Sequence, residues 1–525
     1  MISDLPQDFI RQLTAEYGVS DAEFEALALA LRSEPTVAIA STIGISEVAV
    51  RKRLGEVYRK FNITGIRPGK IAELKQFLIS QYQARNRSTT NSRTDWGEAP
   101  DLGAFYGRIA DLNLLKQWVN ADSARLVAIL GMTGCGKTSL SVQFAQQNQT
   151  QFDFVIWRSL RNSPSVTDLV TTLIEFISQQ PAKNLPDDSN SQISLLLECL
   201  QAHRCLIVLD DFETLLQTEE LAGYYRTGYE EYRELFQRVA EINHQSCLIL
   251  ISSEAPAELA LLSVNSVKQL KPTGADIIAK EIFKEKGLSA TPEEWQKLLN
   301  RYRDNLLAFK IVAITIKDFF NGHVSQFLEA TALFVDDTLT YLLEQQFERL
   351  TSSEEDVMYW LAIIEQQIGI FQLKQQFFES LSLSEYLNNL DSLERRSLIE
   401  KTTTDSEIML QLQPLIKKYV TQQLVQQVTQ EVQQLLRQPN FSNFSVLKNY
   451  CLGKSCEKQQ INTARQSSQL LQQLANNLQN KLRRSEGNIY DSLKQLGENL
   501  KKQPRLKVGY AGANLNDIIS KIPSN

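Results

Sequence analysis

The sequence predicts a multidomain protein: an all-α N-terminal domain, a central α/β domain built on a parallel sheet, helical and winged-helix domains, and an all-α C-terminal segment. Its 525 residues exceed the ~100–200 residues of a usual single domain. Apolar strand-like runs alternate with helical patterns in the centre, and a polar stretch at 85–98 separates this part from the preceding helices. We expect a first domain at 1–82, a linker at 83–100, and further domains at 101–270, 271–339, 340–440 and 441–525.

The composition is typical of a soluble globular protein: 43% of the residues are hydrophobic and 22% are charged. The formal net charge of −6 means that any nucleic-acid site has to be a local patch. No apolar run approaches the ~18 residues that a membrane span needs, and the N-terminus lacks the pattern of a signal peptide. The six cysteines form neither a disulfide framework nor a zinc motif, so we expect a reducing cytoplasm and no metal beyond nucleotide-bound Mg²⁺.

Charge is strongly polarised near the N-terminus. Residues 1–34 carry a net charge of −5, whereas residues 51–75 carry +6. A helix is expected after Ser20, where Glu23 completes a capping box, and a basic helix capped by Ser46 follows a glycine-containing turn. Helix, turn and basic second helix are what a helix-turn-helix needs to place side chains in the major groove of DNA.

This part of the chain resembles the LuxR/GerE-type DNA-binding domain over roughly residues 20–78. The matching residues are Ile45-Ser-Glu-Val-Ala-Val-Arg-Lys-Arg-Leu54 and Val57-Tyr-Arg-Lys-Phe-Asn-Ile63. The resemblance implies contacts to base edges or the backbone from Glu47, Arg51 and Lys52, and contacts to phosphates from Arg53 and Lys60. The alternative interpretation is a solvated basic helix on a protein-interaction module, since the same three-helix shape also docks proteins.

A phosphate-binding loop is predicted at Gly131–Thr138, which reads Gly-Met-Thr-Gly-Cys-Gly-Lys-Thr. The apolar run before it and the helical pattern after it supply the context that a P-loop requires. Glycines let successive backbone N–H groups turn toward phosphate oxygens at a helix N-terminus. Lys137 would reach the β- and γ-phosphates, and Thr138 would bind Mg²⁺. The predicted nucleotide contacts are Gly131, Met132, Thr133, Gly134, Cys135, Gly136, Lys137, Thr138 and Ser139.

A second apolar run, Cys205–Leu209, ends in two aspartates and matches a Walker B pattern. Asp210 would hold Mg²⁺ through water, and Asp211 would orient or deprotonate the attacking water. The alternative, two solvated acids at the end of a strand, is disfavoured because the P-loop precedes this run in the chain. Asp210 and Asp211 are therefore the candidate catalytic residues.

Residues 101–440 resemble the NB-ARC subgroup of the STAND NTPases, especially bacterial proteins in which this region precedes WD or pentapeptide repeats. The resemblance is carried by Gly107-Arg108, by Asp111 where the family usually has glutamate, and by the stretches Phe152–Leu160 and Gly223–Tyr229. It implies ADP and ATP as ligands, with Gly107 and Arg108 against the adenine.

Two positions depart from what this resemblance implies. After the strand-like run Cys247–Ile251, the family has a polar or arginine sensor for the γ-phosphate, and this chain has Ser253. Where the family places a proline against adenine, this chain has Leu306. A serine can hydrogen-bond a phosphate but cannot offset its charge, so we expect a slow ATPase at most.

The remaining segments read as helical and winged-helix domains. Residues 273–330 are helix-patterned, and from 340 to about 419 helices and two short strands indicate a winged helix, which in STAND proteins closes on ADP and moves away on ATP. The Gln- and Leu-rich residues 421–480 predict helical pairs. Val508–Leu515 resembles the segment that precedes repeats in relatives, and the sequence ends about ten residues later. The sensing repeats are therefore expected in a partner protein, or lost.

Two functional hypotheses remain. The first is a cytoplasmic STAND-type signal-transduction ATPase that ADP and ATP gate, that binds DNA through residues 45–61 to regulate transcription, and that forms a nucleotide-dependent homo-oligomer. The second is a non-switching adaptor that keeps nucleotide as a structural ligand and binds protein through its N-terminal helices; Ser253 and Leu306 motivate it. A metabolic P-loop kinase is disfavoured because nothing resembles an acceptor site or a lid.

Overall fold

The computed structural model divides into two compact units, Met1–Arg93 and Thr94–Asn525. Each unit has its own hydrophobic core. The structure describes residues 10–11, 13–14, 17–31, 35–61, 63, 70–71, 74–75, 78, 94–103, 105–181, 185–186, 188–262, 265–331, 333–364, 366–377, 381–404, 407–438, 444–453, 467–482 and 489–522.

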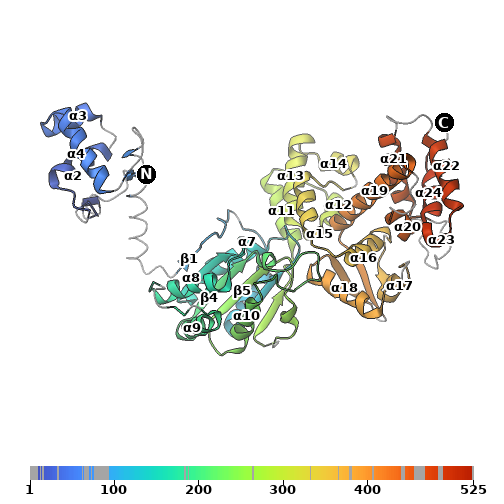
Figure 1. Ribbon diagram of the computed structural model, residues 1–525, viewed down its shortest axis with the longest axis horizontal. Helices are drawn as coiled ribbons and strands as arrows, with labels where there is room; N and C mark the ends of the chain where they lie inside the picture. Colours follow the sequence, from blue (N-terminus) through green and yellow to red (C-terminus); the bar gives the residue numbers. More distant parts are fainter. Residues whose placement is uncertain are drawn as a thin grey trace. The chain divides into compact units, whose positions relative to one another are not determined.

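Three helices of the N-terminal unit have described bounds: α2 (Asp21–Leu31), α3 (Thr36–Ile43) and α4 (Glu47–Lys60) (Figure 1). They pack through buried apolar residues such as Leu27, Val50 and Val57. The predicted order of helix, turn and basic helix is confirmed.

Local capping explains where these helices begin and end. The Ser20 N–H donates to the Glu23 carboxylate at 2.7 Å, which forms the expected capping box at the start of α2. The Ser46 hydroxyl accepts the Ala49 N–H at 3.3 Å and starts α4. Gly44 ends α3 with φ at +69°, in the left-handed region that favours glycine.

The second unit is organised around a sheet with six parallel strands in its described part, in the order β1-β3-β4-β5-β2-β6. The central strands are buried on both faces, which is why they read as continuous apolar runs. Because the strands are parallel, the carboxyl ends of β2, β4 and β5 meet at one edge of the sheet. The strands are β1 (Thr94–Asp95), β2 (Leu126–Leu130), β3 (Phe154–Ser159), β4 (Cys205–Asp210), β5 (Cys247–Ser252) and β6 (Val267–Leu270).

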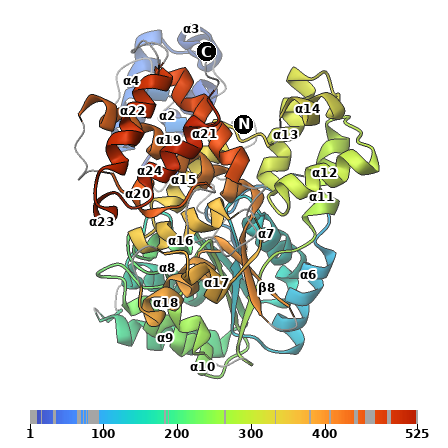
Figure 2. The same cartoon turned by 90° about the vertical axis from the view of Figure 1, so that its right-hand side faces the viewer.

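Helices cover both faces of this sheet. One face packs against α8 (Val166–Ser178), α9 (Ser189–Ala202) and α10 (Glu231–Glu241). The opposite face packs against α6 (Ile109–Lys116), its π-helical extension Gln117–Ala121, and α7 (Lys137–Asn148). Figure 2 shows α6 and α9 on opposite sides of the strands. The predicted α/β domain with a parallel sheet is confirmed.

The end of the predicted linker at 83–100 belongs instead to the α/β domain. Thr94 and Asp95 form the edge strand β1 beside β3, and the Asp95 carboxylate lies 2.7 Å from the Arg158 guanidinium. A strand of two polar residues carries no hydrophobic alternation, so the sequence alone could not distinguish it from a linker.

Four helices follow the sheet in the described residues: α11 (Ala275–Glu285), α12 (Pro292–Tyr302), α13 (Leu306–Phe319) and α14 (Val324–Ala330). They share one core, and a capping box of Thr291 and Glu294 starts α12. We call residues 275–330 the helical segment.

Residues 337–412 come next, and we call them the winged-helix segment after the expectation from the sequence. Its small antiparallel sheet has the order β7-β9-β8. Strands β8 and β9 agree with the two short strands expected from the sequence, whereas β7 has only two residues and was not predicted. The elements are α15 (Asp337–Phe347), α16 (Ser352–Ile363), β7 (Ile368–Gly369), α17 (Ile370–Lys374), α18 (Leu383–Arg395), β8 (Ile399–Thr403) and β9 (Ile408–Leu412).

The C-terminal helices extend the core of the winged helix. The long helix α19 packs against α16 on one side and α21 on the other, and one apolar cluster runs from Leu343 to Ile522. The expected boundary at residue 440 therefore does not separate two cores. The helices are α19 (Pro414–Arg437), α20 (Val446–Asn449), α21 (Ser467–Leu482), α22 (Ile489–Lys501), α23 (Arg505–Val508) and α24 (Ala511–Ile519).

Two expectations from the composition can be compared with the described residues. No helix among them is both long and apolar enough to cross a membrane. Cys135, Cys199, Cys205 and Cys247 are free thiols, but Cys451 is disulfide-bonded, which its spacing in the sequence did not predict.

Candidate functional site

The P-loop connects the carboxyl end of β2 to the start of α7, as the motif predicts. Gly131, Gly134 and Gly136 have φ values of +156°, +88° and +90°, a region that side chains rarely adopt. A Cβ atom at Gly134 would also stand 2.8 Å from Asn305 Oδ1. The loop glycines are thus required both by the backbone conformation and by close packing.

Lys137 lies over the loop that precedes it. Its side chain is buried, and its ammonium group donates to the carbonyl oxygens of Gly131 at 2.7 Å and Met132 at 3.3 Å. The positive charge is therefore held at the loop that would receive phosphate oxygens.

The predicted Mg²⁺ residues face each other across the sheet edge. The Thr138 hydroxyl donates to Asp210 Oδ1 at 3.4 Å. Burial, together with the neighbouring Asp211 carboxylate, raises the pKa of Asp210 to about 6. Mg²⁺ takes oxygen ligands from one or two carboxylates, from phosphates and from water. The Thr138 hydroxyl and the Asp210 carboxylate, whose negative charge is not neutralised by its surroundings, therefore fit this ion.

Asp211 turns toward the end of β3. Its φ is +59°, its Oδ2 accepts the Ser159 hydroxyl at 3.0 Å, and the Arg161 guanidinium lies 3.4 Å from the same oxygen. Asp211 directly follows β4, where the motif locates it, and its role toward water stays a prediction; its contacts with Ser159 and Arg161 were not predicted. The available clue was the change from apolar to polar residues at the end of β3.

Ser253, the predicted sensor, follows β5 beside Asp211 but is already hydrogen-bonded. Its hydroxyl donates to Glu213 Oε1 at 2.9 Å, and its N–H donates to Glu213 Oε2 at 3.3 Å. Glu213 lies in a short 3₁₀ helix, Phe212–Leu215, directly after the Walker B aspartates. The ends of β4 and β5 are thus linked by one carboxylate.

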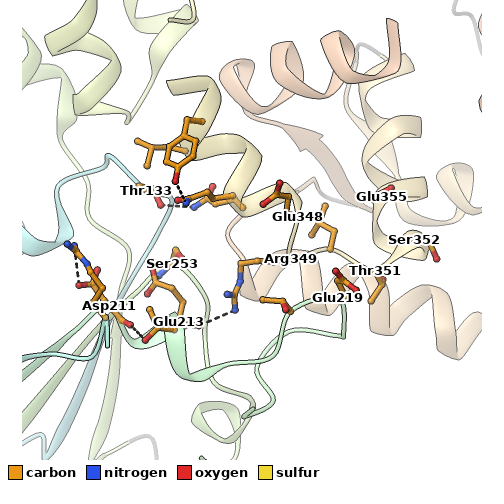
Figure 3. A pocket seen from close by; sticks show the side chains of 18 residues that line it. Thr133, Asp211, Glu213, Glu219, Ser253, Glu348, Arg349, Thr351, Ser352 and Glu355 are labelled. Carbon is orange, nitrogen blue, oxygen red and sulfur yellow. Dashed lines mark hydrogen bonds and ion pairs between the residues drawn. The ribbon is translucent and has the colours of Figure 1, made fainter. Parts of the chain in front are cut away.

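A cavity of about 1390 Å³ opens in front of these strand ends. Thr133, Asp211 and Ser253 line it from the α/β domain, and Gln346 and Arg349 line it from the winged-helix segment (Figure 3). The Gln346 amide donates to the Thr133 hydroxyl at 2.8 Å, so the winged-helix segment contacts the P-loop directly.

Arg108 is buried behind the P-loop. Its guanidinium donates to the Cys135 carbonyl at 2.6 Å and pairs with Asp111 at 3.1 Å. Asp111 in turn accepts the Thr273 N–H at 2.8 Å and the Thr273 hydroxyl at 2.9 Å. Both carboxylate oxygens of Asp111 therefore accept hydrogen bonds, and Gly107, which precedes Arg108, has φ at +64°.

The start of α13 packs against the other side of the loop. The Leu307 N–H donates to the Gly134 carbonyl at 3.1 Å, and the Asn305 amide donates to the Thr133 carbonyl at 3.2 Å. Leu306 Cδ1 would lie 3.0 Å from a Cβ at Gly136, so this leucine packs against the loop, and its contact with adenine stays a prediction. Asn305 was not predicted, because an asparagine before a helix reads only as a cap.

The residues proposed for DNA belong to the other unit, and two of them are engaged within it. Lys60 Nζ lies 2.6 Å from Glu23 Oε2 and 2.7 Å from the Gly18 carbonyl. Arg53 donates to the Ala22 carbonyl at 3.1 Å. Both side chains thus tie α4 to the region of α2.

The other three candidates lie on the outer face of α4. Arg51 and Glu47 form an ion pair of 2.7 Å one turn apart, and both are about half exposed. Lys52 is exposed, and the neighbouring Val48 is 72% exposed.

Comparisons with known proteins agree with this geometry. Residues 110–228 match the NB-ARC domain. An uncharacterized WD repeat-containing protein of Nostoc sp. strain PCC 7120 is 43% identical over 380 residues, which cover 70% of this chain and 30% of the relative. The chain thus spans less than a third of that relative's length.

Two solved structures are also similar. The Walker-type ATPase of Pyrococcus abyssi has 13% identity and a TM-score of 0.43, and the match covers 60% of this chain and 96% of that one. A signal transduction ATPase with numerous domains and a tetratricopeptide repeat sensor, from Pyrococcus horikoshii, has 16% identity and a TM-score of 0.33, covering 77% and 59%. The stretch that matches the NB-ARC domain, residues 110–228, contains both the P-loop and the Walker B aspartates.

Proposed function

We propose that the protein is an ADP/ATP-gated switch of the STAND type, with slow hydrolysis at most. The observation that carries this proposal is the position of Thr133. Its carbonyl binds Asn305 at the start of α13, and its hydroxyl binds Gln346 of α15. Nucleotide phosphates bound at the loop change the surroundings of Thr133, and so they bias the placement of both segments.

The residues present also set the expected chemistry. Lys137, Thr138 and Asp210 would hold the nucleotide with Mg²⁺, which would supply charge neutralisation at the phosphates. Asp211 orients a water molecule. Ser253 offers a hydroxyl that Glu213 already accepts, so its contribution to transition-state charge is small. This combination favours holding a nucleotide over rapid turnover.

The test is the nucleotide content of the purified full chain, combined with ADP and ATP binding by calorimetry. Lys137→Ala removes the charge at the loop and is expected to abolish retention. Lys286→Ala removes an exposed lysine of the helical segment and is the matched control. The proposed switch is contradicted if the unaltered chain binds neither nucleotide. It is also contradicted if the Lys137→Ala variant binds nucleotide as the unaltered chain does.

For the N-terminal unit we propose DNA binding as the output, through the exposed face of α4. The support is the exposure of Arg51 and Lys52 on a helix that follows a glycine turn. The competing function is a protein-docking adaptor, and it is favoured by the exposed Val48 and by the internal bonds of Arg53 and Lys60.

Salt-dependent DNA binding separates the two outputs. Arg51→Ala with Lys52→Ala is expected to weaken binding across sequences and to lower the salt slope by roughly 1 for each phosphate that the variant no longer neutralises. Arg11→Ala, a basic residue outside α4 that pairs with Asp21, is the control. A chain that does not bind DNA at low salt supports the adaptor instead.

A further inference from the structure

Three buried charged side chains and the partly buried Arg349 lie together where the α/β domain meets the winged-helix segment. Glu254, which directly follows Ser253, lies 3.0 Å from Arg349 and 3.5 Å from Arg396. Arg396 also lies 3.3 Å from Glu354. The side chains of Glu254, Arg396 and Glu354 are 2%, 3% and 0% exposed.

Arg349 reaches the exits of two strands at once. Besides Glu254 after β5, its guanidinium donates to the carbonyls of Glu213, Leu216 and Gln217 at 3.1, 3.4 and 3.2 Å, all in the segment after β4. Figure 3 shows Arg349 extending toward Glu213 from the winged-helix side of the cavity. One side chain therefore ties the segments after the Walker B aspartates and after the sensor serine to the end of α15.

The loop at 220–223 is held between the same groups. Arg396 donates to the Glu220 carbonyl at 2.6 Å, and Gly223 donates its N–H to Glu254 Oε1 at 2.8 Å. Ala222 donates its N–H to the Ser392 hydroxyl at 2.6 Å, and that hydroxyl donates to Glu354 at 2.6 Å. The network thus joins both sides of the contact through side chains and backbone together.

Such a network breaks as a unit. Buried ion pairs contribute little net stability when intact, because desolvation offsets attraction, but removing one partner leaves an uncompensated charge. Full separation returns all four groups to water, where they are solvated. Intact and fully open arrangements are therefore both tolerated, whereas a half-broken one is disfavoured, which is the property of a two-state element.

We propose that Glu254, Arg349, Arg396 and Glu354 form a latch that transmits the state of the strand exits to the winged-helix segment. Arg349 acts as a positioning residue: it holds the segments that carry Asp211 and Ser253, and a shift of either segment on nucleotide exchange strains the bonds to Glu254. The winged helix then releases without itself contacting the phosphates. This inference rests on the proposed nucleotide switch.

The test is the release rate of a fluorescent ADP analogue from the full chain, chased with excess ADP. Glu254→Gln keeps an acceptor for the Gly223 N–H but removes the charge between the two arginines. Release is expected to become faster by roughly 5- to 150-fold, the usual range of coupling between two sites. Arg349→Gln, whose side chain is 17% exposed, provides a second variant that does not require loss of a fully buried group.

Arg301→Gln is the matched control. Arg301 also donates to two carbonyls, Thr331 at 2.8 Å and Leu328 at 3.2 Å, but both lie at the end of the helical segment, away from the network. Its release rate is expected to equal that of the unaltered chain. The double variant Glu254→Gln with Arg349→Gln should release no faster than the faster single variant, because both act through one contact.

The outcomes distinguish the two proposals. Absence of ADP binding by the unaltered chain overturns the proposed function, and the latch with it. Normal binding with unchanged release in both single variants overturns the latch alone. Single effects that multiply in the double variant also overturn it, since independent destabilisation adds in free energy.

Discussion

The helical segment and the winged-helix segment hold the nucleotide-binding domain by different chemistry. At the start of the helical segment the contact with the P-loop is made by neutral groups: Asn305 and Leu307 each make one hydrogen bond to it, and Leu306 packs against it. The winged-helix segment also makes one neutral contact with the loop, from Gln346 to Thr133, but in addition it contacts the strand exits through a buried charge network around Glu254 and Arg396. That charge network lies beyond the loop.

The difference between a neutral contact and a charged one affects how each of the two segments moves. A neutral hydrogen bond contributes about 1 kcal/mol and can be exchanged for water singly. A buried charge network resists partial opening, because an unpaired buried charge costs several kcal/mol. We therefore expect the helical segment to adjust gradually around a nucleotide and the winged-helix segment to change position in one step.

The largest effect is expected from Arg396→Met. This change leaves Glu354, fully buried, and Glu254 without a shared partner, so the free energy of unfolding should fall by about 3–5 kcal/mol. Urea denaturation of the full chain, followed by tryptophan fluorescence, measures it. Lys284→Gln breaks the exposed pair with Glu281 and should change stability by less than about 1 kcal/mol. Equal losses of stability in the two variants would show that the buried network has no special energetic role.

Gly223→Ala tests the loop inside the network. Gly223 has φ at +91°, and a Cβ there would stand 2.8 Å from the Ala257 nitrogen and 2.9 Å from the Ala255 carbonyl oxygen. Backbone strain and clash together should cost about 2–3 kcal/mol in thermal unfolding.

Gly228→Ala is its matched control, since Gly228 has φ at +89° with nothing within 4 Å of the added atom. It should cost only the ~1 kcal/mol of the left-handed backbone. If Gly223→Ala is no worse than Gly228→Ala, the loop is not clamped against residues 255–257.

Asn305→Ala examines the neutral contact. It removes the cap of α13, where Asn305 accepts the Ala308 N–H at 2.9 Å, and it removes the bond to Thr133. The expected loss of stability is about 1 kcal/mol from the cap, with a weaker affinity for ADP. Thr291→Ala removes the cap of α12 without touching the loop, so its ADP affinity in calorimetry should stay unchanged. A similar decrease of affinity in both variants would argue against a direct role of Asn305.

Local motifs were predictable, and contacts between distant residues were not. The P-loop and the Walker B aspartates each combine an apolar strand with a fixed pattern at its end, so Lys137 and Asp210 could be placed from the sequence. Arg396 and Glu254 are far apart in the chain, and single charged residues carry no periodic pattern. Their pairing depends on how the winged-helix segment packs against the α/β domain, and this packing could not be predicted from the sequence.

For α4 and Ser253, too, the local structure was predictable from the sequence, but the contacts with distant residues were not. The helix and its caps follow from local pattern, but the bonds of Lys60 to Glu23 and Gly18 depend on the neighbouring helix. Ser253 was located by its position after β5, yet its bond to Glu213 comes from a segment 40 residues earlier. The sequence therefore predicted where these residues lie along the chain, but it did not predict their hydrogen-bond partners.

The smallest effect is expected at Asp304, next to the neutral contact. Burial raises the pKa of this carboxyl above its usual 3.8, so its ionised form is disfavoured in the folded chain. Protonation of Asp304 therefore favours the folded state, and this contribution to the free energy of unfolding is lost as the pH rises through the raised pKa. Asp304→Asn should therefore stabilise the chain at pH 7 by a few tenths of a kcal/mol, because the group is partly solvated, and the gain should shrink toward pH 4. Paired urea denaturations at the two pH values measure this difference. A variant less stable than the unaltered chain at pH 7 would mean that ionised Asp304 supports the contact of the helical segment, so that this contact would be partly electrostatic as well.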